Sequence, residues 1–326
     1  MPIEIITPRD EQHWLQERTN DLTSTEMPAL FGMSPYATRF ELWHRKRGAT
    51  LLEIADNERM RWGRRLEAVI AHGIAEDRGW TIKPLKVYVR DTACRMGASF
   101  DFEIIGDPRG PGVLEIKNVD LFRYLDTWTF SRDESGRKTV EAPAHIEVQL
   151  QAQLTVLEEL DYRWGVIAAF VGGNTPVLIE RTHDAEVAMA LRSEATAFWR
   201  SIEDGHAPEP MFPDDAQAVI RQHWMAEPGT LADLTHDARA AELAAAYLDA
   251  QRRETLASDE KESCKAELLQ LIGDREKAIC PGGTKISAAM VAPSAGTLIT
   301  PAMVGTYVGG RKGYRAFRVT APKGAK

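Results

Sequence analysis

Charged side chains stand at short intervals in two neighbouring apolar segments of the chain. In "GVLEIKNV", residues 112–119, Glu115 and Lys117 are two positions apart. Residues two apart on a strand project from the same face, so a strand here would hold a carboxylate beside an ammonium. In "GASFDFEII", residues 97–105, Asp101 alternates with two phenylalanines that belong in a core. If the two segments pair as a hairpin, Asp101, Glu115 and Lys117 converge.

These three side chains could hold and use a metal ion. Two carboxylates separated by one hairpin can jointly bind a hard divalent cation such as Mg²⁺, which prefers oxygen ligands. Such a cation lowers the pKa of a bound water and offsets charge that develops on a phosphate. Lys117 could orient that water or help to deprotonate it. Spacing alone leaves another interpretation open, in which a surface hairpin carries solvated acids and a simple salt bridge.

Two helices carry further polar residues at the edge of their apolar stripes. Glu67 lies in "WGRRLEAVI", on a helix predicted over 57–78, and alone it could be an ordinary surface acid. Gln149 and Gln153 are four apart on a helix predicted over 143–160, where amides commonly line the rim of a core. Together with the hairpin, these residues follow one order along the chain: a helix Glu, then Asp and Glu-x-Lys, then a helix Gln.

The elements that must position these residues can be outlined from periodicity and turn residues. The connector "GDPRGPG" makes the segments 94–106 and 112–119 an antiparallel hairpin. Thr23 and Glu26 fit a capping box at the start of a short helix over 26–31, with Thr23 as the N-cap. Further helices are expected at 7–20, 38–48, 184–203 and 231–273, and further strands at 80–90, 164–171 and 176–181.

Composition bounds the class of protein. The 326 residues, 44% of them hydrophobic, suffice for one large domain and a smaller one. Three cysteines far apart exclude a zinc ribbon, an iron–sulfur cluster and a disulfide scaffold. The net charge of −8 weakly opposes a non-specific nucleic-acid binder, although basic tracts lie in 39–65 and 311–326. The chain has neither an apolar run long enough for a membrane span nor a secretory signal, which predicts a cytoplasmic protein without membrane contact.

The domain organisation follows from a shift in composition. Residues 204–215, "DGHAPEPMFPDD", are rich in proline and acids and are typical of a linker. We therefore predict a core over 1–203, a linker over 204–230, and a C-terminal module of helices and small strands over 231–326. Irregular apolar spacing in that module makes a strict coiled-coil seam doubtful.

The order of these motifs resembles the YqaJ-type viral recombinase family, which includes the phage lambda exonuclease and has an Asp…Glu-x-Lys nuclease core. The resemblance covers residues 14–200. It rests on "ERTNDLTSTE", "GMSPYATRFELWHRKRG", "MRWGRRLEAVI", "GASFDFEI", "GVLEIKNV" and "PAHIEVQLQAQLTVL". It implies an α/β fold, a restriction-endonuclease-like core with a mixed central sheet flanked by helices. The C-terminal helix-plus-hairpin extension lies outside the compared region.

The resemblance also implies roles for individual residues. The metal-binding positions, for Mg²⁺ or Mn²⁺ and for two ions, are matched by Glu67, Asp101 and Glu115. Lys117 matches the lysine that contacts the attacking water, and Gln149 matches a glutamine that supports the catalytic site. Arg18 and Thr25 match positions that contact the terminal phosphate of the DNA strand. The family often has serine where this chain has Thr25, and the added methyl group changes the geometry there.

The implied function is a metal-dependent DNA exonuclease of phage or prophage recombination that hydrolyses phosphodiesters from duplex ends, 5′ to 3′. Two alternatives stay open: an endonuclease on the same core, and a non-catalytic DNA-binding protein that keeps the fold. The implied partners are double-stranded DNA ends, a phage single-strand annealing protein and further copies of the chain in a trimeric ring. The implied location is the cytoplasm of a bacterial host.

Overall fold

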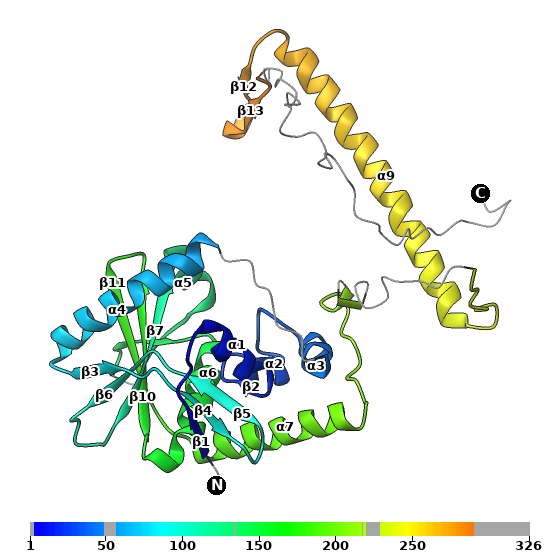
Figure 1. Ribbon diagram of the computed structural model, residues 1–326. Helices are drawn as coiled ribbons and strands as arrows, with labels where there is room; N and C mark the ends of the chain where they lie inside the picture. Colours follow the sequence, from blue (N-terminus) through cyan, green and yellow to red (C-terminus); the bar gives the residue numbers. More distant parts are fainter. Residues whose placement is uncertain (1–2, 49–56, 134, 217, 220–228, 290–326) are drawn as a thin grey trace, which may run out of the picture. The chain divides into compact units, whose positions relative to one another are not determined.

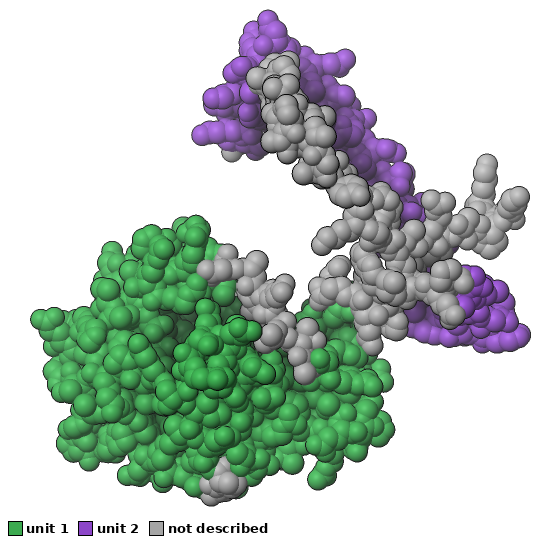
Figure 2. Space-filling model, viewed as in Figure 1, with its two compact units in different colours: residues 1–220 green, residues 221–326 purple. Residues whose placement is uncertain are grey.

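The computed structural model describes residues 3–48, 57–133, 135–216, 218–219 and 229–289. The chain divides into two compact units, residues 1–220 and 221–326 (Figure 2). Three sequence features fall wholly or partly outside the described residues: the end of the predicted C-terminal module from residue 290 on, the basic tract 311–326, and the middle of the basic tract 39–65.

The first unit contains two main sheets (Figure 1). Its strands are β1 (Ile3–Ile6), β2 (Leu22–Thr23), β3 (Thr81–Pro84), β4 (Tyr88–Asp91), β5 (Met96–Ser99), β6 (Phe102–Ile105), β7 (Gly112–Val119), β8 (Thr129–Arg132), β9 (Lys138–Glu141), β10 (Trp164–Val171) and β11 (Thr175–Thr182). The smaller sheet has the order β1-β4-β5-β2, and the central sheet has the order β11-β10-β7-β6-β3. In the central sheet β7 runs parallel to β10 and antiparallel to β6, so this sheet is mixed, as predicted.

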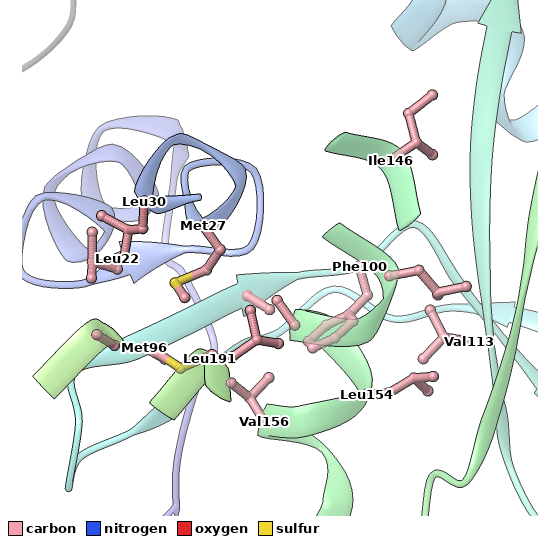
Figure 3. Packing of buried hydrophobic residues seen from close by; sticks show 14 of the residues in the cluster. Leu22, Met27, Leu30, Met96, Phe100, Val113, Ile146, Leu154, Val156 and Leu191 are labelled. Atoms are coloured by element: carbon pink, nitrogen blue, oxygen red, sulfur yellow. The ribbon is translucent and has the colours of Figure 1, made fainter. Parts of the chain in front are cut away.

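Helices cover both faces of the central sheet. The helices of this unit are α1 (Glu11–Thr19), α2 (Met27–Leu30), α3 (Arg39–Arg47), α4 (Glu58–Arg78), α5 (Leu121–Thr127), α6 (Ala144–Val156), the short η1 (Glu158–Leu160) and α7 (Ala185–Glu203). On one face, Ile70 and Ile74 of α4 join the cluster that holds Leu114 of β7. On the other face, Leu154 of α6 belongs to the larger core, together with Val113 of β7 (Figure 3). The predicted α/β class, with a mixed sheet flanked by helices, is confirmed.

Two predicted strands each divide between the two sheets. The segment 80–90 forms β3 in the central sheet and β4 in the smaller one, and the segment 94–106 forms β5 and β6 in the same divided way. The crossings lie side by side, because the Leu85 amide donates to the Asp101 carbonyl at 3.2 Å. Alternation along one unbroken strand would place Asp101 and Glu103 on the same face, but Asp101 lies at the crossing, outside β5 and β6. Glu103 instead contacts Tyr162 and Lys83.

The start of α2 differs from the predicted capping box. The N-cap of α2 is Glu26, not Thr23. Thr23 belongs to β2 and pairs with Gly97 of β5, so its backbone is held in the smaller sheet. The Thr23 hydroxyl and amide still donate to the Glu26 carboxylate, at 2.9 Å each. A complete capping box forms at the start of α3, where Thr38 is the N-cap.

A buried acid, Asp215, connects the segment after α7 to α3 of the same unit. Asp215 is 1% exposed and accepts hydrogen bonds from the Thr38 hydroxyl and the Met211 amide. The boundary between the units, at residue 220, lies inside the segment predicted as a linker. The start of that segment therefore packs against the core.

The described part of the second unit, residues 229–289, contains one long helix and a small hairpin. Its elements are α9 (Ala238–Ile272), β12 (Lys277–Ile279), η2 (Pro281–Gly283) and β13 (Lys285–Ser287), with β12 and β13 antiparallel. The predicted helix-plus-hairpin extension is confirmed, and its helix begins at residue 238 instead of 231. Among the residues described, no helix is both long and apolar enough to cross a membrane.

Candidate active site

Glu115 lies at the centre of a buried hydrogen-bond network on β7. It is 3% exposed, and strand alternation turns it toward α6 while Leu114 and Ile116 face α4. Its Oε1 accepts from Lys117 Nζ and from Gln149 Nε2, both at 2.6 Å. Its Oε2 accepts from Gln153 Nε2 at 2.7 Å. Side chains from two separate segments, β7 and α6, therefore meet at one carboxylate.

Lys117 is a charged group held between an acid and an amide. Its ammonium donates to Glu115 and, at 3.1 Å, to Gln149 Oε1, while 25% of its side chain stays exposed. Burial acts to lower the pKa of Lys117, but Glu115 and Asp101 act more strongly, so that the pKa lies above its ordinary value. The lysine is therefore a protonated hydrogen-bond donor at neutral pH.

Asp101 reaches the site from the crossing between the two sheets. Its Oδ2 accepts from the backbone amide of Ile116 at 2.8 Å, which places the carboxylate directly beside β7. Burial raises the pKa of Asp101 well above its usual value, and the negative charges of Glu115 and Glu67 raise it further. The pKa of Glu67 on α4 is also raised, first by burial and then by Glu115. Three carboxylates are therefore close enough to repel one another.

Arg18 and Thr25 form a second polar group near the end of α1. The Arg18 guanidinium donates to Thr25 Oγ1 at 3.3 Å and stacks over the Trp14 ring at 4.3 Å. Thr25 Oγ1 also lies 3.0 Å from Thr23 Oγ1. No carboxylate among the described residues forms an ion pair with Arg18. A guanidinium of this kind can bind a phosphate or carboxylate group through two parallel hydrogen bonds.

One cavity of about 470 Å³ joins the two groups. All seven predicted site residues line it: Arg18, Thr25, Glu67, Asp101, Glu115, Lys117 and Gln149. The structure thus brings together every candidate that the sequence singled out, although the role of each stays a prediction.

Comparison with known proteins identifies the region that carries this cavity. Residues 13–159 match the model of the YqaJ-like viral recombinase domain. This match covers just under half of the chain. The chain is 28% identical over 202 residues to a protein of Bacillus subtilis (strain 168) called uncharacterized protein YqaJ, a match that spans 61% of this chain and 58% of the relative.

Solved structures with a similar arrangement include an alkaline exonuclease, LHK-Exo, from Laribacter hongkongensis. Its crystal structure has 17% sequence identity and a TM-score of 0.46, and the match covers 60% of this chain and 94% of that one. The structure of LHK-Exo in complex with dAMP has 16% identity and a TM-score of 0.48, with 65% and 97% covered.

The YqaJ-like domain also contains site residues that sequence reasoning did not select. Gln153 is fully buried and bridges Glu115 and the Ser99 carbonyl, the latter at 3.0 Å. Its spacing of four from Gln149 placed it on the same helix face, but not on a particular carboxylate. Trp14 precedes Arg18 by the same spacing, and its indole donates to the Ser99 hydroxyl at 2.7 Å. Spacing on a helix was therefore the signal available for both.

The oxygen donors of the YqaJ-like domain suit a hard divalent cation. Asp101 and Glu67 carry raised pKa values that a cation would relieve, and none of the described residues hydrogen-bonds the Glu67 carboxylate. Within the described ranges no three acid, histidine or cysteine side chains already form a compact ligand cluster. Glu115 has both oxygens engaged by nitrogen donors, but an ionised carboxylate offers about four lone-pair positions. Carboxylate oxygens are the ligands that Mg²⁺ and Mn²⁺ prefer, so the chemistry of these side chains suits such an ion, and their role as its ligands stays a prediction.

Proposed function

We propose that the YqaJ-like domain is a metal-dependent DNA nuclease that degrades duplex ends as an exonuclease, 5′ to 3′, in phage or prophage recombination. One observation carries the proposal: three mutually repelling carboxylates, a protonated lysine and an arginine with no carboxylate partner among the described residues line a single cavity. The carboxylates suit divalent cations, and the arginine suits a phosphate.

In the proposed mechanism each residue of the Glu115 network has a limited task. A bound Mg²⁺ or Mn²⁺, two ions in our proposal, would lower the pKa of water and offset charge on the phosphate. Lys117 donates a hydrogen bond to the attacking water and orients it, because its ammonium is protonated. Gln149 contacts both Lys117 and Glu115 and so fixes the distance between them. Asp101, Glu67 and Glu115 supply the oxygen ligands.

The second polar group supports action at strand ends. A terminal 5′-phosphate bound by Arg18 and Thr25 would lie in the same cavity as the carboxylates. A strand anchored by its end presents a phosphodiester near its terminus to those carboxylates, as exonuclease action requires. Such digestion exposes a 3′ strand, so a single-strand annealing protein is the proposed partner. By resemblance, the proposed assembly is a trimeric ring.

The test compares linear and covalently closed circular duplex DNA, each with Mg²⁺, with Mn²⁺ and with EDTA. We expect the metal-dependent loss of linear DNA only, and no digestion by Glu115→Ala. Cleavage of closed circles would identify the endonuclease alternative on the same core. DNA binding in EDTA without cleavage after metal is added would instead identify a non-catalytic DNA-binding protein.

A further inference from the structure

A buried lysine lies directly beneath the arginine–threonine pair. Lys46 of α3 is 8% exposed, and its ammonium has three acceptors, the number of hydrogens that it can donate. These acceptors are the Arg18 carbonyl at 3.0 Å, the Asp21 carbonyl at 2.6 Å and a Glu26 carboxylate oxygen at 2.8 Å. Two of the three, the Arg18 and Asp21 carbonyls, belong to the backbone at the C-terminal end of α1 and just after it. Lys46 therefore fixes the end of that helix.

Glu26 connects the same lysine to the threonine side of the pair. Its Oε2 accepts from both the amide and the hydroxyl of Thr23, and its Oε1 accepts from Arg45 at 2.8 Å. The Thr23 hydroxyl in turn contacts the Thr25 hydroxyl. The Lys46–Glu26 ion pair is thus hydrogen-bonded on one side to the backbone of Arg18 and, through Thr23, on the other side to the side chain of Thr25.

Burying the Lys46–Glu26 ion pair costs stability, because both charges lose most of their contact with water. Burial lowers the pKa of Lys46 although Glu26 acts to raise it, so the charged ammonium is less favourable here than it would be in water. Well-packed apolar residues commonly give equal or better stability than a buried ion pair. Neither Lys46 nor Glu26 lines the cavity, so they act through the residues that do.

We propose that Lys46 and Glu26 are positioning residues that hold Arg18 and Thr25 in the geometry that recognises a terminal phosphate. This inference rests on the proposed function, because it names the elements that give the site its selectivity for strand ends. The purely structural alternative is that the pair only stabilises the packing of α3 against β2. The two differ in one measurable quantity, the preference for a phosphorylated over an unphosphorylated end.

The experiment measures that preference without cleavage. Fluorescence anisotropy in EDTA gives the dissociation constants for a blunt duplex with a 5′-phosphate and for the same duplex with a 5′-hydroxyl. We expect the parent protein to prefer the phosphate, and Arg18→Ala to lose that preference. Glu26→Gln and the double variant Glu26→Gln with Lys46→Met should each reduce it about tenfold or more, since charge-assisted hydrogen bonds depend on alignment.

Arg192 offers a matched control elsewhere in the first unit. Its guanidinium bonds the buried Asp91 at 3.1 Å and the Thr155 carbonyl at 2.9 Å, as Lys46 bonds Glu26 and backbone carbonyls. Arg192→Met should lower the thermal unfolding temperature while the preference for the phosphate stays at the parent value. A loss of preference in this control as well would mean that destabilisation alone accounts for the effect, and would overturn the inference.

A milder variant keeps the test decisive if a charge deletion prevents folding. Thr23→Val removes only the hydroxyl that joins Glu26 to Thr25, with little change of shape. It should weaken the preference in the same direction, whereas an unchanged preference in folded Thr23→Val and Glu26→Gln proteins would refute positioning. Parent protein that prefers the phosphate in EDTA but cleaves no DNA with metal would contradict the proposed function and leave this inference supported. A parent protein that binds the phosphorylated and the unphosphorylated duplex equally well would overturn this inference.

Discussion

Gln153 and Glu115 are joined by a hydrogen bond of 2.7 Å although they lie 38 positions apart in the chain. The same amide nitrogen also donates to the carbonyl of Ser99, so one buried side chain links α6 to both β5 and β7. Glu115 is held from two sides by glutamines one helical turn apart. Its orientation is therefore set by α6 as much as by β7.

The first prediction concerns this amide. Gln153→Leu keeps the volume but leaves Glu115 Oε2 buried without its donor, so the carboxylate should rotate and nuclease activity should fall about 10- to 100-fold. The measurement is initial rate against Mg²⁺ concentration, where a higher metal requirement indicates a misplaced ligand. Gln151→Leu is the control, because the Gln151 amide contacts the Thr182 carbonyl and the Asp184 amide, away from Glu115. Equal losses of nuclease activity in both variants would show that the Gln153–Glu115 hydrogen bond has no specific role in activity.

The second prediction concerns the lysine of the network. Lys117→Met should lower the turnover number by about 10²–10⁴, the range for loss of a group that assists proton transfer or water orientation. Lys83→Met is the matched control, because Lys83 pairs with Glu103 at 2.5 Å in the same sheet. Single-turnover cleavage of a bound duplex separates chemistry from binding. A Lys117→Met protein that turns over at the parent rate would remove this residue from the proposed mechanism.

The third prediction concerns stability and pH. Burial acts to raise the pKa of Glu26, but Lys46 and Arg45 outweigh it, and the pKa lies below its ordinary value of 4.5. A depressed pKa means that the unfolded chain takes up a proton at higher pH than the folded one. The stability from this carboxylate is thus complete above about pH 4.5 and is lost as the pH falls through the lower folded value.

Urea unfolding of the parent protein and Glu26→Gln between pH 3 and pH 7 provides the measurement for this prediction. The difference in the free energy of unfolding should be largest near pH 7 and should shrink toward pH 3, where a protonated glutamic acid resembles glutamine. A difference that grows as the pH falls would contradict the assigned direction of the pKa shift.

The fourth prediction concerns the smaller sheet beneath the cavity. A Cβ at Gly97 would overlap the Tyr88 ring, whose hydroxyl donates to Asp21 at 3.0 Å. Gly97→Ala should therefore displace Tyr88 and cost about 1–3 kcal/mol of stability. Gly73→Ala in α4 meets nothing within 4 Å and should stabilise by about 0.5–1 kcal/mol. Thermal unfolding of both variants checks the contrast, which equal effects would contradict.

The sequence predicted the contents of the site better than its framework. The two-residue spacing of Glu115 and Lys117 was enough to place them on one strand face, since β7 is unbroken from end to end. The segment around Asp101 was read as one strand because its apolar residues continue through the crossing without a glycine or proline. A change of sheet depends on which strand each half finds as a partner, and that is a tertiary property.

The hydrogen bond from Thr38 to Asp215 has a practical consequence for where a shortened chain should end. A chain ended after Glu203, where α7 stops, would keep every residue of the cavity but would lose the carboxylate that the Thr38 hydroxyl contacts at the start of α3. The helix that carries Lys46 would then begin with a weakened anchor. A chain that ends a few residues after Asp215 retains that contact, and it is the better starting material for biochemical work on the first unit alone.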